Sequence, residues 1–154
     1  MKVDLASVVR AGVELGDYHG TDRFAHPSIL DALIKFHDGL ASAASSSSAS
    51  AVQSPTSGST AALRFTPHAS HMLYSAAATV LWLIHMPPAA KELVRGAANN
   101  WTRLRDAWRK VRQDDGKVDS VLQAAESGDV DKTLERLLPL VEAAHSARAR
   151  ASSE

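Results

Sequence analysis

Histidine and aspartate side chains are concentrated near the start of the chain, between glycines and Pro27, where we expect a loop. Four of them lie within ten residues: Asp17, His19, Asp22 and His26. Imidazoles and carboxylates bind divalent metal ions and transfer protons in general acid–base catalysis. Loops also collect such residues simply because loops are solvated. We therefore treat these four residues as weak candidates for a metal site, and a metal-dependent enzyme as one alternative function.

A second pair of histidines, His68 and His71, lies three residues apart. The two side chains share one face if a helix begins by Pro67. Two imidazoles at this spacing can bind one metal ion, but a site needs a third ligand, and no acidic residue lies within a turn of either histidine. The pair is thus a further weak metal candidate, and the alternative is an ordinary polar first turn.

The motifs of better-defined catalytic and cofactor sites do not occur in the sequence. There is no cysteine, which excludes thiolate metal ligands and a cysteine nucleophile. There is also no Gly-x-Ser-x-Gly nucleophile motif, no phosphate-binding Gly-rich loop and no His-Glu-x-x-His zinc motif. The sequence therefore predicts a protein that is not an enzyme and binds no cofactor.

The formal net charge is zero, with 17 basic and 17 acidic side chains, but the charges are segregated along the chain. Residues 1–40 carry −2, residues 41–112 carry +6 and residues 113–154 carry −4. Most of the positive charge falls on one predicted helix: Lys91, Arg95, Arg103, Arg105, Arg109, Lys110 and Arg112. We expect these residues to bind a protein partner with an acidic surface.

Two other interpretations of the basic helix stay open. It can be a solvated face that the acidic C-terminal segments neutralise, or a surface for phosphate groups of nucleic acid or anionic lipid. The zero net charge argues against a protein that coats nucleic acid with its whole surface, so nucleic acid is the less favoured partner.

The residue composition favours an all-α fold. The chain has 27 alanines, whereas only 5% of its residues are aromatic and three are isoleucine. Alanine favours helices, and strands need the β-branched and aromatic residues that are scarce here. We therefore predict a bundle of about six helices, near residues 5–13, 27–39, 67–86, 88–112, 118–125 and 130–145, with one long disordered Ser/Ala-rich loop.

The same pattern predicts how the chain is divided. Residues 1–40 form an N-terminal helical hairpin, residues 41–62 a disordered low-complexity linker, residues 63–146 the main bundle, and residues 147–154 a frayed tail. The linker prediction rests on nine serines between residues 41 and 61 and on the lack of any periodic apolar face there.

Three details of the helices follow from local signals. Val94, Ala97, Trp101, Leu104, Trp108 and Val111 repeat in steps of three and four, which predicts one continuous helix packed along a neighbour. Gly128 suits the end of the fifth helix and Asp129 the N-cap of the sixth. Pro139 lies inside that sixth helix, where we expect a kink or a restart.

The most apolar segment, residues 72–86, has two interpretations. It is about 15 residues long, and a bilayer needs about 20, so a central helix buried on all sides is the favoured one. The alternative is a membrane-associated subunit anchored by this helix.

Taken together, the sequence predicts a non-enzymatic protein–protein interaction module, such as an adaptor or a small subunit of a larger assembly. It would use the basic helix and the apolar central helix. An intracellular, most simply cytoplasmic, location fits the lack of cysteine and of a secretory signal, with an organellar or membrane-associated location as the alternative.

Overall fold

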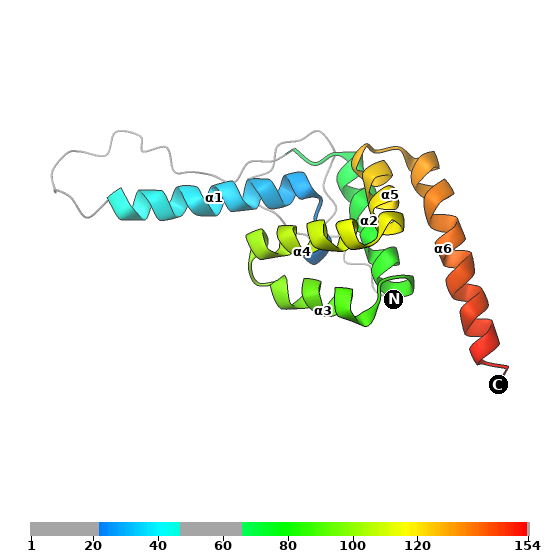
Figure 1. Cartoon of the computed structure of the whole chain (residues 1–154). Helices are drawn as coiled ribbons and strands as arrows, with labels where there is room; N and C mark the ends of the chain where they lie inside the picture. The colour runs from blue at the N-terminus through cyan, green and yellow to red at the C-terminus, as the bar shows by residue number, and fades with distance from the viewer. Residues whose placement is uncertain (1–21, 47–65, 154) are drawn as a thin grey trace, which may run out of the picture.

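The computed structural model describes residues 22–46 and 66–153, and the side chains of residues 22–42 and 66–153. These residues form six α-helices and a short 3₁₀ helix at Asp22–Phe24, with no strand among them (Figure 1). The all-α prediction is confirmed. The helix predicted near residues 5–13 lies outside the described residues, as does most of the predicted linker.

The first two helices lie on either side of the undescribed residues 47–65. The helix α1 spans Pro27–Ser46 and α2 spans Ala69–Ile84. Pro27 occupies the first position of α1, where a missing N–H costs nothing. The helix continues to Ser46 rather than ending near Gly39, because the run after Leu40 is rich in alanine, the best helix former. The predicted linker therefore begins with helical residues 41–46.

The predicted continuous helix over residues 88–112 is two helices, α3 (Pro88–Ala97) and α4 (Trp101–Asp114). The break falls at Ala98–Asn100, and the side chain of Asn100 caps α4 by accepting a hydrogen bond from the backbone N–H of Arg103 at 2.9 Å. Figure 1 shows α3 and α4 as a hairpin. The apolar spacing runs through the break without a change of phase, which is why it predicted a single helix.

The last two helices follow tight turns, and the turn before α6 has the chemistry that the sequence predicted. The helix α5 spans Gly116–Glu126, and the Asp115 side chain caps it at the backbone N–H of Lys117. Gly128 has a φ of +75°, and Asp129 then caps α6, Val130–Ala151. The helix α6 does not restart at Pro139, and it is helical through residues 147–151, where the sequence predicted a frayed tail.

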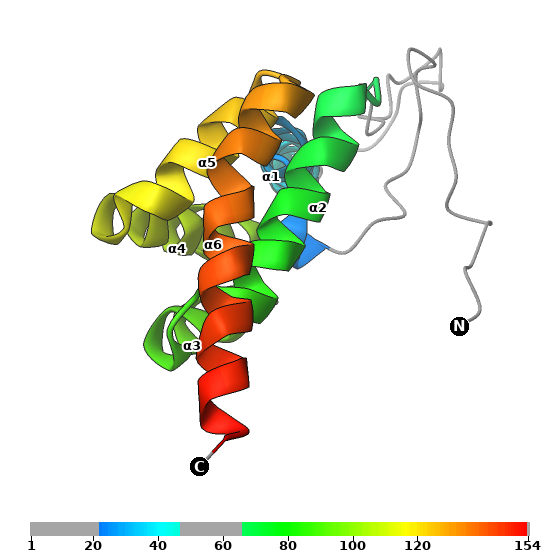
Figure 2. The same cartoon turned by 90° about the vertical axis from the view of Figure 1, so that its right-hand side faces the viewer.

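One hydrophobic core joins all six helices. Its members are buried aliphatic and aromatic side chains, which include Leu30, Leu81, Leu104, Leu122 and Leu137. Since α1 contributes Ile29, Leu30 and Leu33 to this core, the described part of residues 1–40 packs into the bundle. The helix α2 lies against α5 and α6 (Figures 1 and 2).

The helix α2 is a core helix. The sequence predicted that it is buried on all sides, but one side is exposed. Tyr74, Ala78 and Leu81 are buried, whereas Met72 is 76% exposed and Leu83 is 63% exposed. None of the helices in the described ranges has the length and apolarity that a membrane-spanning helix requires.

Candidate functional site

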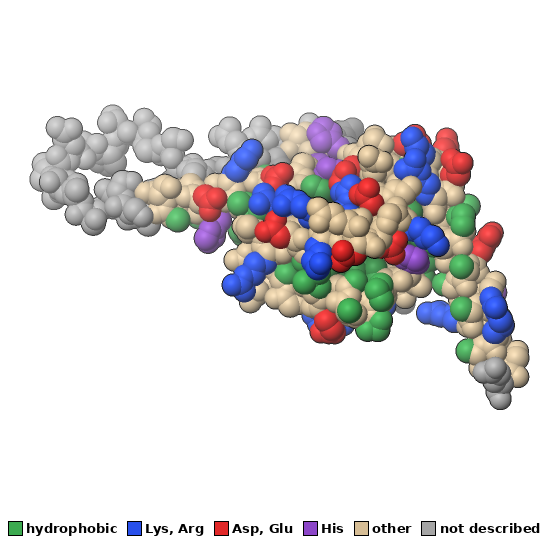
Figure 3. All heavy atoms as spheres, viewed as in Figure 1, with side chains coloured by type: hydrophobic (Ala, Val, Ile, Leu, Met, Phe, Trp, Pro, Cys, Tyr) green, Lys and Arg blue, Asp and Glu red, His purple; other side chains and the backbone are tan. Residues whose placement is uncertain are grey.

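The seven cations predicted to bind a partner are, for the most part, already paired within the chain. Arg95 pairs with Glu92, Arg109 with Asp106 at 3.1 Å, and Lys110 with Asp114 at 3.3 Å, all on the exposed surface. Arg105 reaches Asp31 of α1 at 3.0 Å. Figure 3 shows the resulting mixture of blue and red side chains over α4. Of the seven, Lys91 and Arg103 have no carboxylate partner among the described residues.

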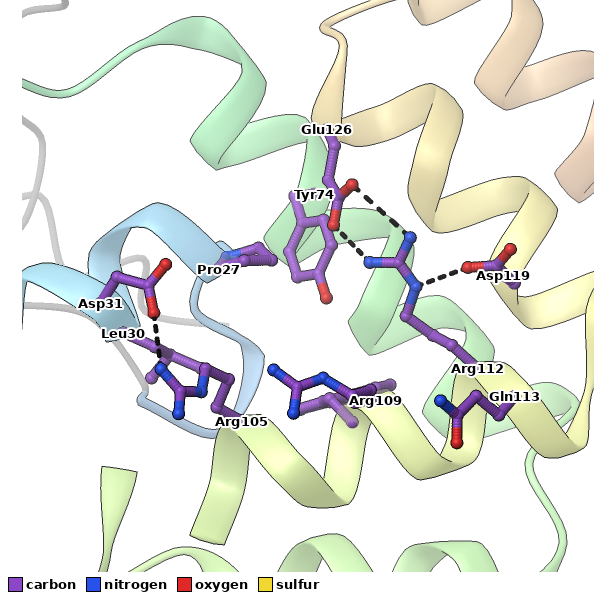
Figure 4. Close-up of a pocket in the computed structure, with 11 residues that line it drawn as sticks. Pro27, Leu30, Asp31, Tyr74, Arg105, Arg109, Arg112, Gln113, Asp119 and Glu126 are labelled. Atoms are coloured by element: carbon purple, nitrogen blue, oxygen red, sulfur yellow. Dashed lines mark hydrogen bonds and ion pairs between the residues drawn. The ribbon is translucent and has the colours of Figure 1, made fainter. Parts of the chain in front are cut away.

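Arg112 is held most firmly of the seven. Its Nε donates to Asp119 at 2.6 Å, and both terminal nitrogens donate to the Glu126 carboxylate (Figure 4). Burial lowers the pKa of Arg112, but the hydrogen bonds to the two carboxylates outweigh burial and raise it, so the charge is permanent. Arg112 therefore joins α4 to α5 and is not a free contact residue.

A cleft of about 520 Å³ opens between α1, α2, α4 and α5 beside these ion pairs (Figure 4). Tyr74 forms its floor, and Arg105, Arg109 and Arg112 line one wall. Burial raises the pKa of the Tyr74 hydroxyl, so this group stays protonated near neutral pH. The carboxylates of Asp31, Asp106, Asp119 and Glu126 offset the positive charge of the three arginines, which weakens the attraction of the cleft for an anionic ligand.

The structure brings three of the predicted metal candidates together at the converging N-termini of α1 and α2. The Ser28 hydroxyl lies 2.8 Å from His26 Nδ1 and 3.1 Å from His71 Nε2, and the centres of the His26 and His71 rings are 4.7 Å apart. The backbone N–H of His68 donates to His71 Nδ1 at 3.2 Å. Both Nδ1 atoms thus accept hydrogen bonds from the chain itself.

His26 and His71 are held in the neutral form near neutral pH. Burial, followed by the nearby His26 and His68, lowers the pKa of His71 to about 4. Burial also lowers the pKa of His26, partly offset by Glu126. Within the described ranges, no group of three or more histidine, aspartate or glutamate side chains is placed to hold a metal ion.

The predicted Asp/His loop is only partly visible. Asp17 and His19 lie outside the described residues. Asp22 accepts a hydrogen bond from the Trp101 indole N–H at 2.9 Å, and the carbonyl of Arg23 accepts one from the Trp108 indole at 2.7 Å. These contacts fasten the 3₁₀ helix to α4, which gives Asp22 a structural role.

A different surface emerges on α6. Four aliphatic side chains on one side of this helix are between 36% and 53% exposed: Val130, Leu134, Leu138 and Val141, which we call the α6 stripe. Thr133, Leu137 and Leu140 face the core instead. The apolar residues at positions 130, 134, 137, 138 and 141 all follow helical spacing, so the sequence pattern alone does not separate the exposed stripe from the buried Leu137. The available signal was the width of the apolar face, because with Leu140 these residues span roughly 160° around the helix axis, more than the stripe of about 100° that typically faces a core.

The second half of α6 has few contacts with the rest of the molecule. From Val141 to Ala151 every residue except Ala144 is exposed. Figures 1 and 2 show this half projecting beyond the other helices, and Figure 3 shows green side chains along it. An isolated helical segment of this length is marginally stable in water.

Comparisons with protein-family models, with curated proteins and with solved structures find no match to this chain.

Proposed function

We propose that the protein is a non-enzymatic protein–protein interaction module, an adaptor or a small subunit of a larger assembly, and that its contact surface is the α6 stripe. The observation that carries this proposal is four exposed aliphatic side chains in line on a helix whose second half projects from the bundle. A continuous exposed apolar surface is typical of a site for another protein.

The basic helix is a weaker choice for this surface than the sequence suggested. Five of its seven cations have carboxylate partners within the chain, and such pairs satisfy the charges without a ligand. The apolar helix α2 buries Tyr74, Ala77, Ala78, Leu81 and Trp82 in the core, and its exposed large apolar side chains are Met72 and Leu83. The α6 stripe is thus the largest aligned set of apolar side chains that the described residues leave uncovered.

Quantitative affinity purification from the native organism tests the proposal. The tagged wild type is compared with a Leu134→Glu/Leu138→Glu variant and with a Lys91→Glu/Arg103→Glu variant, which removes the two unpaired cations. Leu134, Leu138 and Arg103 are exposed and Lys91 is half-buried, so we expect both variants to unfold within about 1 kcal/mol of the wild type. Co-purifying proteins should be lost with the α6 variant and retained with the basic-helix variant. Loss in the basic-helix variant alone would contradict the proposal and favour the acidic-partner hypothesis.

A further inference from the structure

The α6 stripe has a charged edge that indicates the chemistry of its partner. At 100° per residue, Asp131, Glu135 and Glu142 fall along the side of the stripe that faces away from the core. All three are exposed, and none forms an ion pair with a described residue. The acidic side chains of α4 differ, because Asp106 and Asp114 are each paired with a cation on the same helix.

Lys132 and Arg136 do not neutralise this edge, because they fall on the opposite side of the helix from the stripe. Arg148 and Arg150 lie in the last turn of α6, six or more residues beyond Glu142. Arg136 donates instead to the backbone carbonyl of Ser120 at 2.7 Å, which ties α6 to α5. Asp131 and Glu135 are moreover four residues apart, a spacing at which like charges repel and slightly destabilise a helix. A cation supplied from outside the chain would relieve that repulsion.

We propose that the α6 stripe binds an amphipathic helix of another protein, one whose apolar seam is bordered by lysine or arginine. This inference rests on the proposed function, since it names the partner of the same surface. The stripe advances in steps of 4, 4 and 3, the spacing with which one helix packs along another. The α6 stripe supplies the apolar contact, and Asp131, Glu135 and Glu142 select for opposite charge on the partner.

The basic helix α4 of a second copy fits the surface less well. Three of its four guanidinium groups are engaged with Asp31, Asp106, Asp119 and Glu126, so this helix offers few unpaired cations. The partner chemistry is thus the reverse of what the sequence suggested: the charge selected is positive, and the surface that selects it is on α6.

Two synthetic helical peptides provide the test. They share one leucine seam and differ only at the flanking positions, which are lysine in one and glutamate in the other. Binding to the full-length chain is followed by fluorescence anisotropy at low salt. The lysine peptide should bind on the order of tenfold more tightly than the glutamate peptide, and the difference should shrink as salt screens the charges.

Charge reversal on the protein makes the test specific. An Asp131→Lys/Glu135→Lys/Glu142→Lys variant should reverse the preference, so that the glutamate peptide binds more tightly. A control with the same net-charge change, Glu92→Lys/Asp106→Lys/Asp114→Lys, should keep the preference for the lysine peptide. Circular dichroism and thermal unfolding verify that each variant folds.

Each other outcome counts against the inference. Equal binding of the two peptides, or an unchanged preference in the α6 charge variant, would show that the acidic edge does not select. A concentration-dependent dimer in light scattering that the Leu134→Glu/Leu138→Glu change abolishes would identify a second copy as the partner. If neither peptide binds but the affinity purification still depends on Leu134 and Leu138, the proposed function stands and this inference fails.

Discussion

Acid should destabilise this protein through the histidines at the N-termini of α1 and α2. The ring centres of His26 and His71 lie 4.7 Å apart with their planes tilted by 48°, and the His68 ring lies edge-on to His71 with its centre 5.3 Å away. The His26 ring also lies edge-on to the buried Tyr74, and the charges of Glu126 and Arg112 act on it as well. The perturbation is a drop in pH from 7.5 to 5, compared between the wild type and a His71→Gln variant.

The magnitude follows from the pKa of His71. Burial, then the charges of His26 and His68, lowers this pKa from 6.5 in the unfolded chain to about 4 in the fold. Because the folded pKa is the lower one, the stabilisation is complete above pH 6.5 and is lost as pH falls from 6.5 towards 4. Two-state linkage gives a loss of roughly 2 kcal/mol between pH 7.5 and pH 5, which we reduce to about 1 kcal/mol because the ring is partly exposed.

Urea unfolding followed by tryptophan fluorescence measures this loss, since Trp82 and Trp108 are buried in the core. The wild type should lose at least about 1 kcal/mol of unfolding free energy over this range, with His26 adding to the effect in the same direction. The His71→Gln variant should lose about 1 kcal/mol less. A His37→Gln control removes an exposed histidine about three turns away along α1 and should behave as the wild type does. An identical pH dependence in the wild type and His71→Gln would refute the reasoning.

Three further predictions concern stability. Arg112→Ala leaves two half-buried carboxylates without their cation and should lower the unfolding free energy by about 2 kcal/mol, whereas Lys110→Ala breaks an exposed pair and should cost less than about 0.5 kcal/mol; chemical denaturation of both variants measures the contrast. Leu81→Ala opens a cavity at a fully buried position and should lower the unfolding free energy by about 3 kcal/mol. Leu83→Ala, on the exposed side of α2, should stay within about 0.5 kcal/mol of the wild type. Equal losses of unfolding free energy would contradict the assignment of the two faces. Gly128→Ala forces a side chain into a positive φ and should lower stability by about 1 kcal/mol in thermal unfolding, although there is room for the added carbon beside Ser70.

Local signals predicted local structure well. Pro27 opens α1, Pro88 opens α3, and the Gly128–Asp129 turn separates α5 from α6, all as the residue types indicate. In the apolar repeat over residues 94–111, Val94, Ala97, Leu104, Trp108 and Val111 are buried. These features depend on backbone preferences and on spacing within a few residues, which a sequence displays directly.

Features that depend on distant segments could not be read in the same way. Asp31 and Arg105 are 74 residues apart, so no helical spacing shows that they pair. Similarly, Ser28 and His71 are in contact only because the N-termini of α1 and α2 lie close together in the fold. The apolar residues of α6 were identified, but whether each faces the core or the solvent depends on where α5 and α2 lie.

The segregation of charge along the chain therefore contributes first to the packing of the helices. The positive segment contains most of α4. The acidic segments before and after it in the sequence contain Asp31 on α1, and Asp119 and Glu126 on α5. Folding brings these carboxylates onto the arginines, so the sign change along the chain fastens three helices together. Charge reversal at Arg112 would then test the fold rather than a binding surface. The acidic side chains beside the α6 stripe stay unpaired in the fold, and they are the charges available to select a partner.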